Sequence, residues 1–189
     1  MANNREDVSE IIKLCGGVSA PGYVFVRCKK DTTGALISYC IIVLNEIGSR
    51  DIYYWDNQNS MPDTTLFGEL YNGSCCYQPQ PDVKDAVKSL HDFFLDRRVV
   101  CFDEDDSYFP IRTLFEGING NEPRADILDL KETVRTIFKK KTQFDLESVK
   151  GYFGMKYEGT GSIIDELRVI YQIFLKLDRL GMIDHIHTL

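Results

Sequence analysis

The chain has little histidine, no Cys-x-x-Cys motif and no long hydrophobic run. Its three histidines do not lie at zinc-finger spacing from any cysteine, and they are too few to place a Ser-His-Asp or Cys-His catalytic set. No apolar run approaches the length of a membrane span, and the first residues lack the apolar segment of a signal peptide. We therefore expect no membrane contact and a cytoplasmic location, of which a ribonucleoprotein granule is one example.

Positive charge is also in deficit. The 22 basic residues are outnumbered by 29 acidic ones, which gives a net charge of −7. This balance disfavours a generally basic nucleic-acid surface. A local basic patch stays open, because Lys139, Lys140 and Lys141 are consecutive. A solvated helix end, where cations complement the helix dipole, is the simpler explanation of that run.

The six cysteines suit a reducing compartment. Cys28, Cys40 and Cys101 fall inside apolar runs, where a free thiol behaves as a small hydrophobic side chain. Cys75 and Cys76 are neighbours in a predicted loop, where two ordinary thiols are commoner than a redox-active pair.

What the chain does have is the composition of a folded protein. Hydrophobic residues make up 43% and aromatic residues 12%, which suits one globular domain spanning residues 1–189 with its core at about 22–180. Apolar runs rich in β-branched and aromatic residues predict strands, and apolar residues at helical spacing predict helices. The predicted strands are 23–28, 36–44, 50–55, 99–102 and 125–128. The predicted helices are 5–15, 83–94, 107–115, 130–139, 146–153 and 163–180. Residues 56–81 are predicted to be a loop with a helical turn near 66–71.

This order of elements predicts an α/β domain with a mixed sheet flanked by helices. The first three strands follow one another through turn sequences, so they should be antiparallel. The last two are reached through helices, so they should be parallel.

Three polar stretches stand where the predicted strands and helices meet. They are residues 29–34 after the first strand, 103–107 after the fourth strand and 160–165 before the last helix. Each has an ordinary structural explanation. The first suits a turn, the second suits the N-terminus of a helix, where acids complement the dipole, and Ser162 with Asp165 resembles a capping box.

Taken together, in order and spacing over roughly residues 22–177, these stretches resemble the motifs of the DEDD-type 3′–5′ exonucleases. The resemblance implies a ribonuclease-H-like fold. In active members four carboxylates hold two divalent metals, which activate a water molecule and stabilise the leaving oxygen. The resemblance places Lys29 at the first carboxylate position and Asp31, a shorter acid, at the second. A lysine there removes a ligand and adds repulsion, because two unit charges about 4 Å apart cost roughly 4 kcal/mol at an effective dielectric of 20.

The other two motifs are also incomplete. Ser107 falls where the third carboxylate should be, and a shift of one residue would offer Asp106 instead; Asp103 is a further acid in this stretch. Asp165 is kept at the fourth position. Thr160 stands where a histidine base is found in one branch of the superfamily, and a threonine hydroxyl cannot take a proton from water near neutral pH. The resemblance therefore implies no catalytic residue, no bound metal and no cofactor.

The stretch from 99 to 114, with the turn at 32–34, is similar to exonuclease-like domains of the exuperantia type, which implies a non-catalytic domain that dimerises and takes part in RNA recognition. We expect a binding module or adaptor in an RNA-related protein complex. The alternatives are a weak metal-dependent 3′–5′ exonuclease using Asp31, Asp103 or Asp106, and Asp165, and a protein-only interaction subunit.

A protein partner is expected, with a homodimer as one form. The last predicted helix carries a second apolar face at Tyr171 and Leu175, which suggests burial on two sides. Direct RNA contact is open but disfavoured, because the acids at 103–106 outnumber Lys29 and Lys30 and would repel phosphates.

Overall fold

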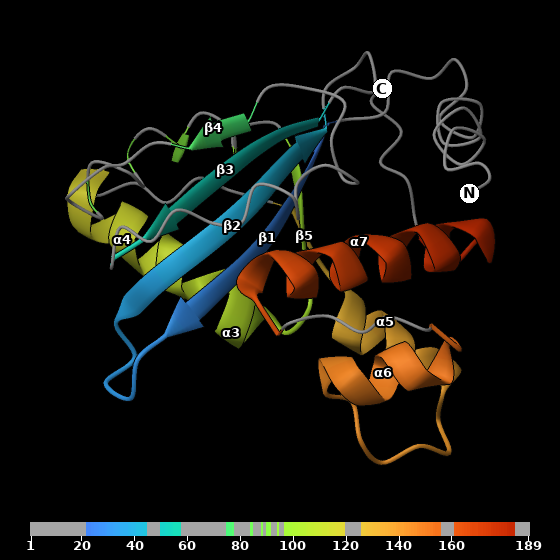
Figure 1. Ribbon diagram of the computed structural model, residues 1–189. Helices are drawn as coiled ribbons and strands as arrows, with labels where there is room; N and C mark the ends of the chain where they lie inside the picture. The colour runs from blue at the N-terminus through green and yellow to red at the C-terminus, as the bar shows by residue number, and fades with distance from the viewer. Residues whose placement is uncertain are drawn as a thin grey trace, which may run out of the picture.

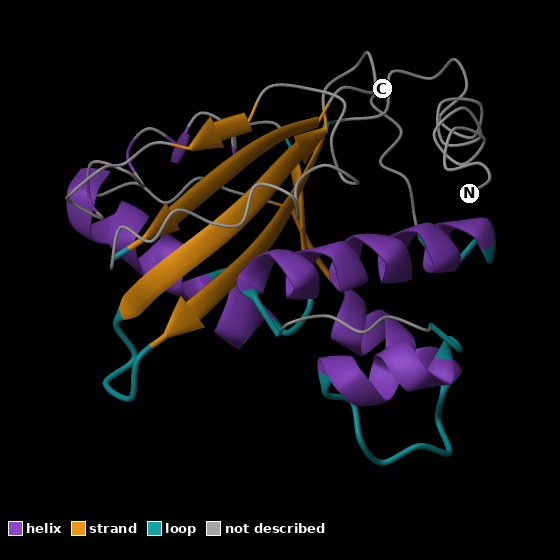
Figure 2. Ribbon diagram, in the orientation of Figure 1, coloured by secondary structure: helices purple, strands orange, loops and turns teal. Residues whose placement is uncertain are grey.

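The computed structural model of the chain describes residues 22–44, 50–57, 75–77, 97–119, 126–155 and 161–183, with single helical positions at 84, 88, 90, 91 and 94. The predicted helix at 5–15, the helical turn near 66–71 and Thr160 lie outside the described residues. The described strands form one six-stranded sheet, and helices cover both of its faces (Figures 1 and 2).

The sheet has the strand order β4-β3-β2-β1-β5-β6. The pairs β1–β2 and β2–β3 are antiparallel, and the pairs β1–β5 and β5–β6 are parallel. The predicted mixed sheet, with three antiparallel strands followed by two parallel ones, is therefore confirmed. The strands are β1 (Tyr23–Lys30), β2 (Leu36–Leu44), β3 (Arg50–Asp56), β4 (Cys75–Tyr77), β5 (Arg98–Cys101) and β6 (Asp126–Asp129).

Strand β4 corrects the prediction that residues 56–81 form a loop whose one regular element is a helical turn near 66–71. Cys75–Tyr77 pairs in parallel with β3, with Cys75 opposite Ile52. Cys75 and Cys76 thus belong to an edge strand of the described sheet. A strand of three residues is too short to show an alternating pattern, so it is formed by pairing with its neighbour and leaves no signal in the sequence.

The strand β1 is the centre of the molecule. Val24 and Val26 face one side of the sheet, Tyr23 and Phe25 face the other, and all four are buried. β-Branched and aromatic side chains suit such a strand because they pack well on a pleated surface. A polar side chain on this strand therefore requires a partner, since an unpaired buried polar group is costly.

The helices agree with the predictions in order but not in every boundary. They are α3 (Glu104–Ser107), α4 (Phe109–Asn119), α5 (Leu130–Ile137), α6 (Leu146–Tyr152) and α7 (Ile163–Arg179). The predicted helix at 107–115 is in fact two helices, beginning three residues earlier. Helix α5 ends at Ile137, so Lys139, Lys140 and Lys141 lie in the following loop, not on a helix end.

Two side-chain caps fix helix starts, and the one at Ser162 was predicted from the sequence. The Asp145 carboxylate accepts from the Ser148 N–H at 2.8 Å and begins α6. The Ser162 hydroxyl accepts from the Asp165 N–H at 3.2 Å and begins α7. Each satisfies a backbone donor that the helix itself cannot pair.

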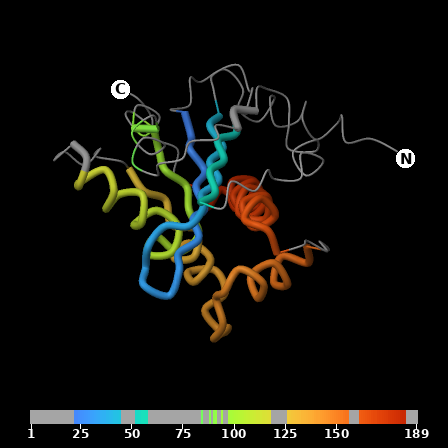
Figure 3. Tube along the Cα trace, turned by 60° about the vertical axis from the view of Figure 1, so that its left-hand side comes forward, coloured from blue at the N-terminus to red at the C-terminus, as the bar shows by residue number. Residues whose placement is uncertain are grey.

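Two layers of helices enclose the sheet. Helix α7 lies across one face, with α5 and α6 beside it, and α4 covers the opposite face together with Leu90 and Phe94 (Figure 3). Within the described residues no helix is long and apolar enough to cross a membrane.

Helix α7 buries both of its apolar faces inside the chain. Its Tyr171 and Phe174 rings each lie 5.0 Å from the Phe25 ring, and Leu175 packs against the same cluster. The second face therefore needs no other subunit to cover it. A homodimer is still a prediction, but the second apolar face of α7 no longer supports it.

We predict that Phe25→Ala lowers the free energy of unfolding by about 3–5 kcal/mol, because it opens a cavity between β1 and α7. Phe109→Ala is the matched control, since Phe109 is 49% exposed, and it should cost less than about 1 kcal/mol. Urea denaturation of both variants measures the difference. Equal losses would contradict the position of Phe25 in the core.

Candidate functional site

The polar stretches singled out in the sequence meet on the α7 side of the sheet, where β1, β5 and β6 end and α3, α5 and α7 begin. The side chain at their centre is Arg27. Its Nε lies 2.7 Å from Glu166 Oε2, and its Nη1 donates to Ser107 Oγ at 3.1 Å. The Ser107 hydroxyl in turn donates to the Phe102 carbonyl at 2.7 Å. One guanidinium thus joins β1, α3 and α7.

This pair is shielded from water. The Arg27 side chain is 19% exposed and that of Glu166 is 24% exposed, so the charges interact more strongly than an exposed pair would. Neither Arg27 nor Glu166 is among the candidate residues that the sequence indicated. The signal that could have found them is physical: a charge in a strand buried on both faces needs a counter-charge nearby.

Lys29 is two residues from Arg27 and lies on the same side of β1. Its Nζ donates to the Gly161 carbonyl at 3.0 Å and lies 3.7 Å from Glu166 Oε1. Glu166 therefore stands between two cations. Lys29 therefore lies beside the residues that open α7.

Lys30 reaches α3. Its Nζ lies 2.8 Å from Asp106 Oδ1 and donates to the Asp105 carbonyl at 3.1 Å. The hydrogen bond from Lys30 holds the pKa of Asp106 below its usual range. Asp106 points outward to this lysine, whereas Ser107 is buried and points to Arg27. Of the two alternatives for the second motif, Ser107 is the residue that faces the centre.

Asp103 has a strained backbone, with φ 67° and ψ 96°, a conformation that costs on the order of 1–3 kcal/mol for a residue other than glycine. The Asp129 carboxylate holds it there. That carboxylate accepts from the N–H groups of Asp103 at 3.0 Å, Glu104 at 3.1 Å and Lys131 at 2.8 Å. The Asp103 carboxylate itself forms an ion pair with Lys131.

Asp31 lies apart from this network, in the turn between β1 and β2. Its Oδ1 accepts from the Thr33 N–H at 2.8 Å, the Thr33 hydroxyl at 2.6 Å and the Ala35 N–H at 3.0 Å. These bonds lower the pKa of Asp31, that of the Thr33 hydroxyl most. Through this one oxygen the carboxylate holds the turn closed.

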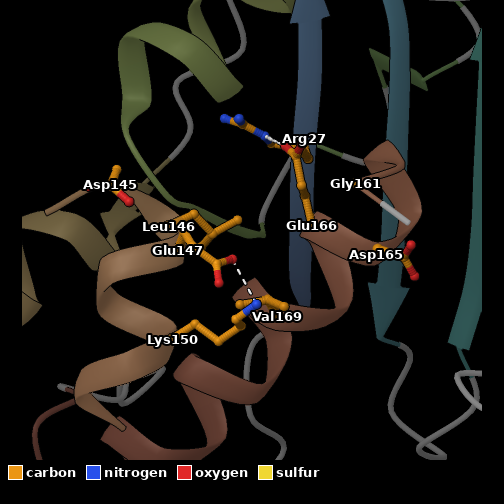
Figure 4. Close-up of a pocket in the computed structure, with 9 residues that line it drawn as sticks. All are labelled: Arg27, Asp145, Leu146, Glu147, Lys150, Gly161, Asp165, Glu166 and Val169. Atoms are coloured by element: carbon orange, nitrogen blue, oxygen red, sulfur yellow. Dashed lines mark hydrogen bonds and ion pairs between the residues drawn. The ribbon is translucent and has the colours of Figure 1, made fainter. Parts of the chain in front are cut away.

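Asp165 is buried at the start of α7, 3% exposed, with Arg168 Nη1 3.6 Å from its Oδ1. Figure 4 shows Glu166 extending toward Arg27 while Asp165 points away from it. Neighbouring positions on the helix therefore have different surroundings, and the acid that meets β1 is Glu166.

Two adjoining hollows share Arg27. One, of about 310 Å³, lies between α6 and α7, and the other, of about 400 Å³, lies between α3, α5 and the α5–α6 loop (Figure 4 shows the first). Acids outnumber cations on their walls by six to four. The acids are Asp103, Asp106, Asp145, Glu147, Asp165 and Glu166, and the cations are Arg27, Lys131, Arg135 and Lys150. Among the described residues, no three histidine, cysteine, aspartate or glutamate side chains are grouped so that they could hold a metal ion.

No protein-family model matches the chain, and no curated protein matches it. A solved structure that does resemble it is the nuclease domain of 3′hExo, a DEDDh family member, bound to rAMP, with a TM-score of 0.54 and 12% identity over 92% of this chain and 100% of that one. The Aedes aegypti Nibbler EXO domain gives a TM-score of 0.42 and 14% identity over 93% and 87%. The chain therefore has a ribonuclease-H-like fold similar to that of DEDDh 3′–5′ exonuclease domains.

We predict that Arg27→Leu lowers the free energy of unfolding by about 1–3 kcal/mol, because it leaves a half-buried carboxylate and a hydroxyl without their donor. Arg135→Leu, which removes an exposed pair with Glu132, should cost less than about 1 kcal/mol. Adding Glu166→Leu to Arg27→Leu should recover part of the loss. Chemical denaturation compares the three proteins. If the Arg27→Leu protein is as stable as the Arg135→Leu protein, the Arg27–Glu166 pair does not stabilise the fold.

We also predict that Lys30→Gln raises the pKa of Asp106 toward the usual 3.8. In the native chain the pKa of Asp106 is lowered. The ion pair therefore stabilises the fold at pH values above the usual pKa of Asp106, and this stabilisation is lost as the pH falls through the lowered pKa. Carboxyl NMR titration measures the shift. Asp145, whose pKa is lowered by Ser148, serves as the internal control and should not move. An unchanged Asp106 would mean that Lys30 does not bind it in solution.

Proposed function

We propose that this chain is a non-catalytic binding module or adaptor with an exonuclease fold, acting in an RNA-related protein complex. The observation that carries the proposal is the Arg27–Glu166 pair at 2.7 Å, with Ser107 as a third partner. A guanidinium and a lysine ammonium stand where the polar motifs converge. Fixed cations at that point oppose the binding of divalent metals, because a unit positive charge about 4 Å away already costs roughly 4 kcal/mol at an effective dielectric of 20.

The acids that an exonuclease would need have other partners. Asp31 closes a turn, Asp106 binds Lys30, and Asp103 binds Lys131. Asp165 is buried at the start of α7 and points away from Arg27 (Figure 4). To coordinate a metal together, these groups would have to leave their partners and move. We therefore infer that the site does not fit the two metals that its sequence resemblance implies.

A binding role is the function that this arrangement leaves open. The fold is that of nuclease domains, and the resemblance to exuperantia-type domains supports a place in an RNA-related complex. The net charge of −7 and the acidic majority in the hollows favour a protein partner, or a second copy of the chain, over direct contact with RNA.

Weak metal-dependent nuclease activity is the second candidate, and the similarity to the 3′hExo nuclease domain is the observation that favours it. It would rest on Asp31, Asp103 or Asp106, and Asp165. The two candidates differ in one direct experiment.

Purified protein is incubated with single-stranded RNA and DNA in magnesium and in manganese. We predict no cleavage above that of an Asp165→Asn/Glu166→Gln protein prepared in parallel, because the acids are already engaged by other groups of the chain and are not free to hold metal ions. Arg27→Lys keeps the positive charge beside Glu166, so we expect this variant to be inactive as well. If the native chain cleaves nucleic acid and the double variant does not, the non-catalytic proposal is wrong and the chain is a nuclease.

A further inference from the structure

The loop between α5 and α6 projects from the lower edge of the molecule (Figure 2) and concentrates positive charge on an acidic protein. Residues 131–150 contain six basic and three acidic side chains. All three acids are already engaged: Glu132 with Arg135, Glu147 with Lys150 at 2.7 Å, and Asp145 in capping α6. The excess charge is carried by residues 139–141, all exposed.

Lysines 139 and 140 make no ion pair or hydrogen bond with any residue in the described part of the chain. This separates them from Lys29, Lys30 and Lys131, each of which has a partner. A group of adjacent lysines without acids to neutralise them repels itself, and binding of an anion relieves that repulsion.

The loop that carries these lysines is anchored. The Lys141 N–H donates to the Phe138 carbonyl at 2.8 Å, and the Lys141 ammonium lies 4.9 Å from the centre of the Tyr152 ring. The Tyr152 hydroxyl donates to the Gln143 carbonyl at 2.7 Å. Phe138 packs on Tyr152 and Phe153 at 5.4 and 5.3 Å. The charges are thus presented from a braced turn, which reduces the entropy lost when a ligand binds.

A hollow with a largely polar wall opens beside this loop, and Thr142, which follows Lys141, lines it. Phe144 and Leu146 line the hollow of about 400 Å³ together with Arg135, whose guanidinium carbon lies 5.6 Å from the centre of the Phe144 ring. The surface therefore offers exposed cations and, near them, the partly buried Phe144 ring, on which an apolar side chain of a ligand can pack. We call the surface formed by Arg135, Lys139, Lys140, Lys141 and Phe144 the basic corner.

From this geometry we propose that the basic corner binds a short acidic segment of a partner protein, a few Asp or Glu residues next to one large apolar residue. A long phosphate chain fits less well, because beyond the lysines the hollow presents Asp103, Asp106 and Asp145. A short peptide can cover the lysines and stop before those acids. The inference rests on the proposed binding role, but it does not depend on the loss of catalysis.

The test uses a fluorescein-labelled peptide of about twelve residues with five glutamates and one phenylalanine, with anisotropy read at about 50 and 300 mM salt. Lys139→Glu/Lys140→Glu is the test variant. Lys84→Glu/Lys88→Glu is the matched control, since both lysines are exposed helical positions, on the segment whose Leu90 and Phe94 pack on the opposite face of the sheet.

We expect the test variant to weaken peptide binding at least about five-fold and the control less than about two-fold, with weaker binding at the higher salt. Replacing the phenylalanine of the peptide by serine should also weaken binding. Equal losses in both variants, no peptide binding, or tighter binding of single-stranded RNA that the test variant loses would each overturn the proposal. Nuclease activity would defeat the proposed function alone, and an inactive protein that ignores the peptide would defeat the basic corner alone.

Discussion

The ion pair between Arg27 and Glu166 is the interaction on which the polar edge of this molecule depends. Arg27 belongs to a strand that is buried on both faces, so its charge has to be met from a neighbouring element. Glu166 of α7 forms an ion pair with Arg27, and Ser107 of α3 accepts a hydrogen bond from it. Lys29 also donates a hydrogen bond to the Gly161 carbonyl, just before α7. The strand end and the two helix starts are held together by a protein cation. In our proposal this cation takes the place that metal ions have in active relatives of the fold.

Much of the fold could be predicted because its signals are local. The apolar runs placed five strands, and the side chain of Ser162 marked the start of α7. Strand β4 was missed because pairing with β3, and not its own three residues, makes it a strand. The start of α3 was missed because the Asp129 carboxylate, 26 positions away from Asp103, holds the backbone there. A hydrogen bond between distant residues leaves no pattern in the sequence.

The sequence indicated which stretches form the candidate site, and the structure shows how their side chains are arranged. The motifs singled out three polar stretches, and the structure brings Lys29 of the first beside the start of α7. Motif matching could not show that the Asp31 carboxylate is used by its own turn, because Asp-Thr-Thr-Gly is compatible with both roles. The sequence also could not tell which acid of α7 faces β1. That depends on the rotation of the helix against the sheet, and it selects Glu166 over Asp165.

The central claim is that protein cations fill the point where metal ions would bind. Manganese binding, followed by the EPR signal of free Mn²⁺ during titration, tests it most directly. The account predicts that the native chain takes up no stoichiometric Mn²⁺ at millimolar concentrations. Uptake of one or two ions per chain that is lost in Asp165→Asn/Glu166→Gln would contradict it, because those acids would then be metal ligands and not partners of Arg27 and the α7 start.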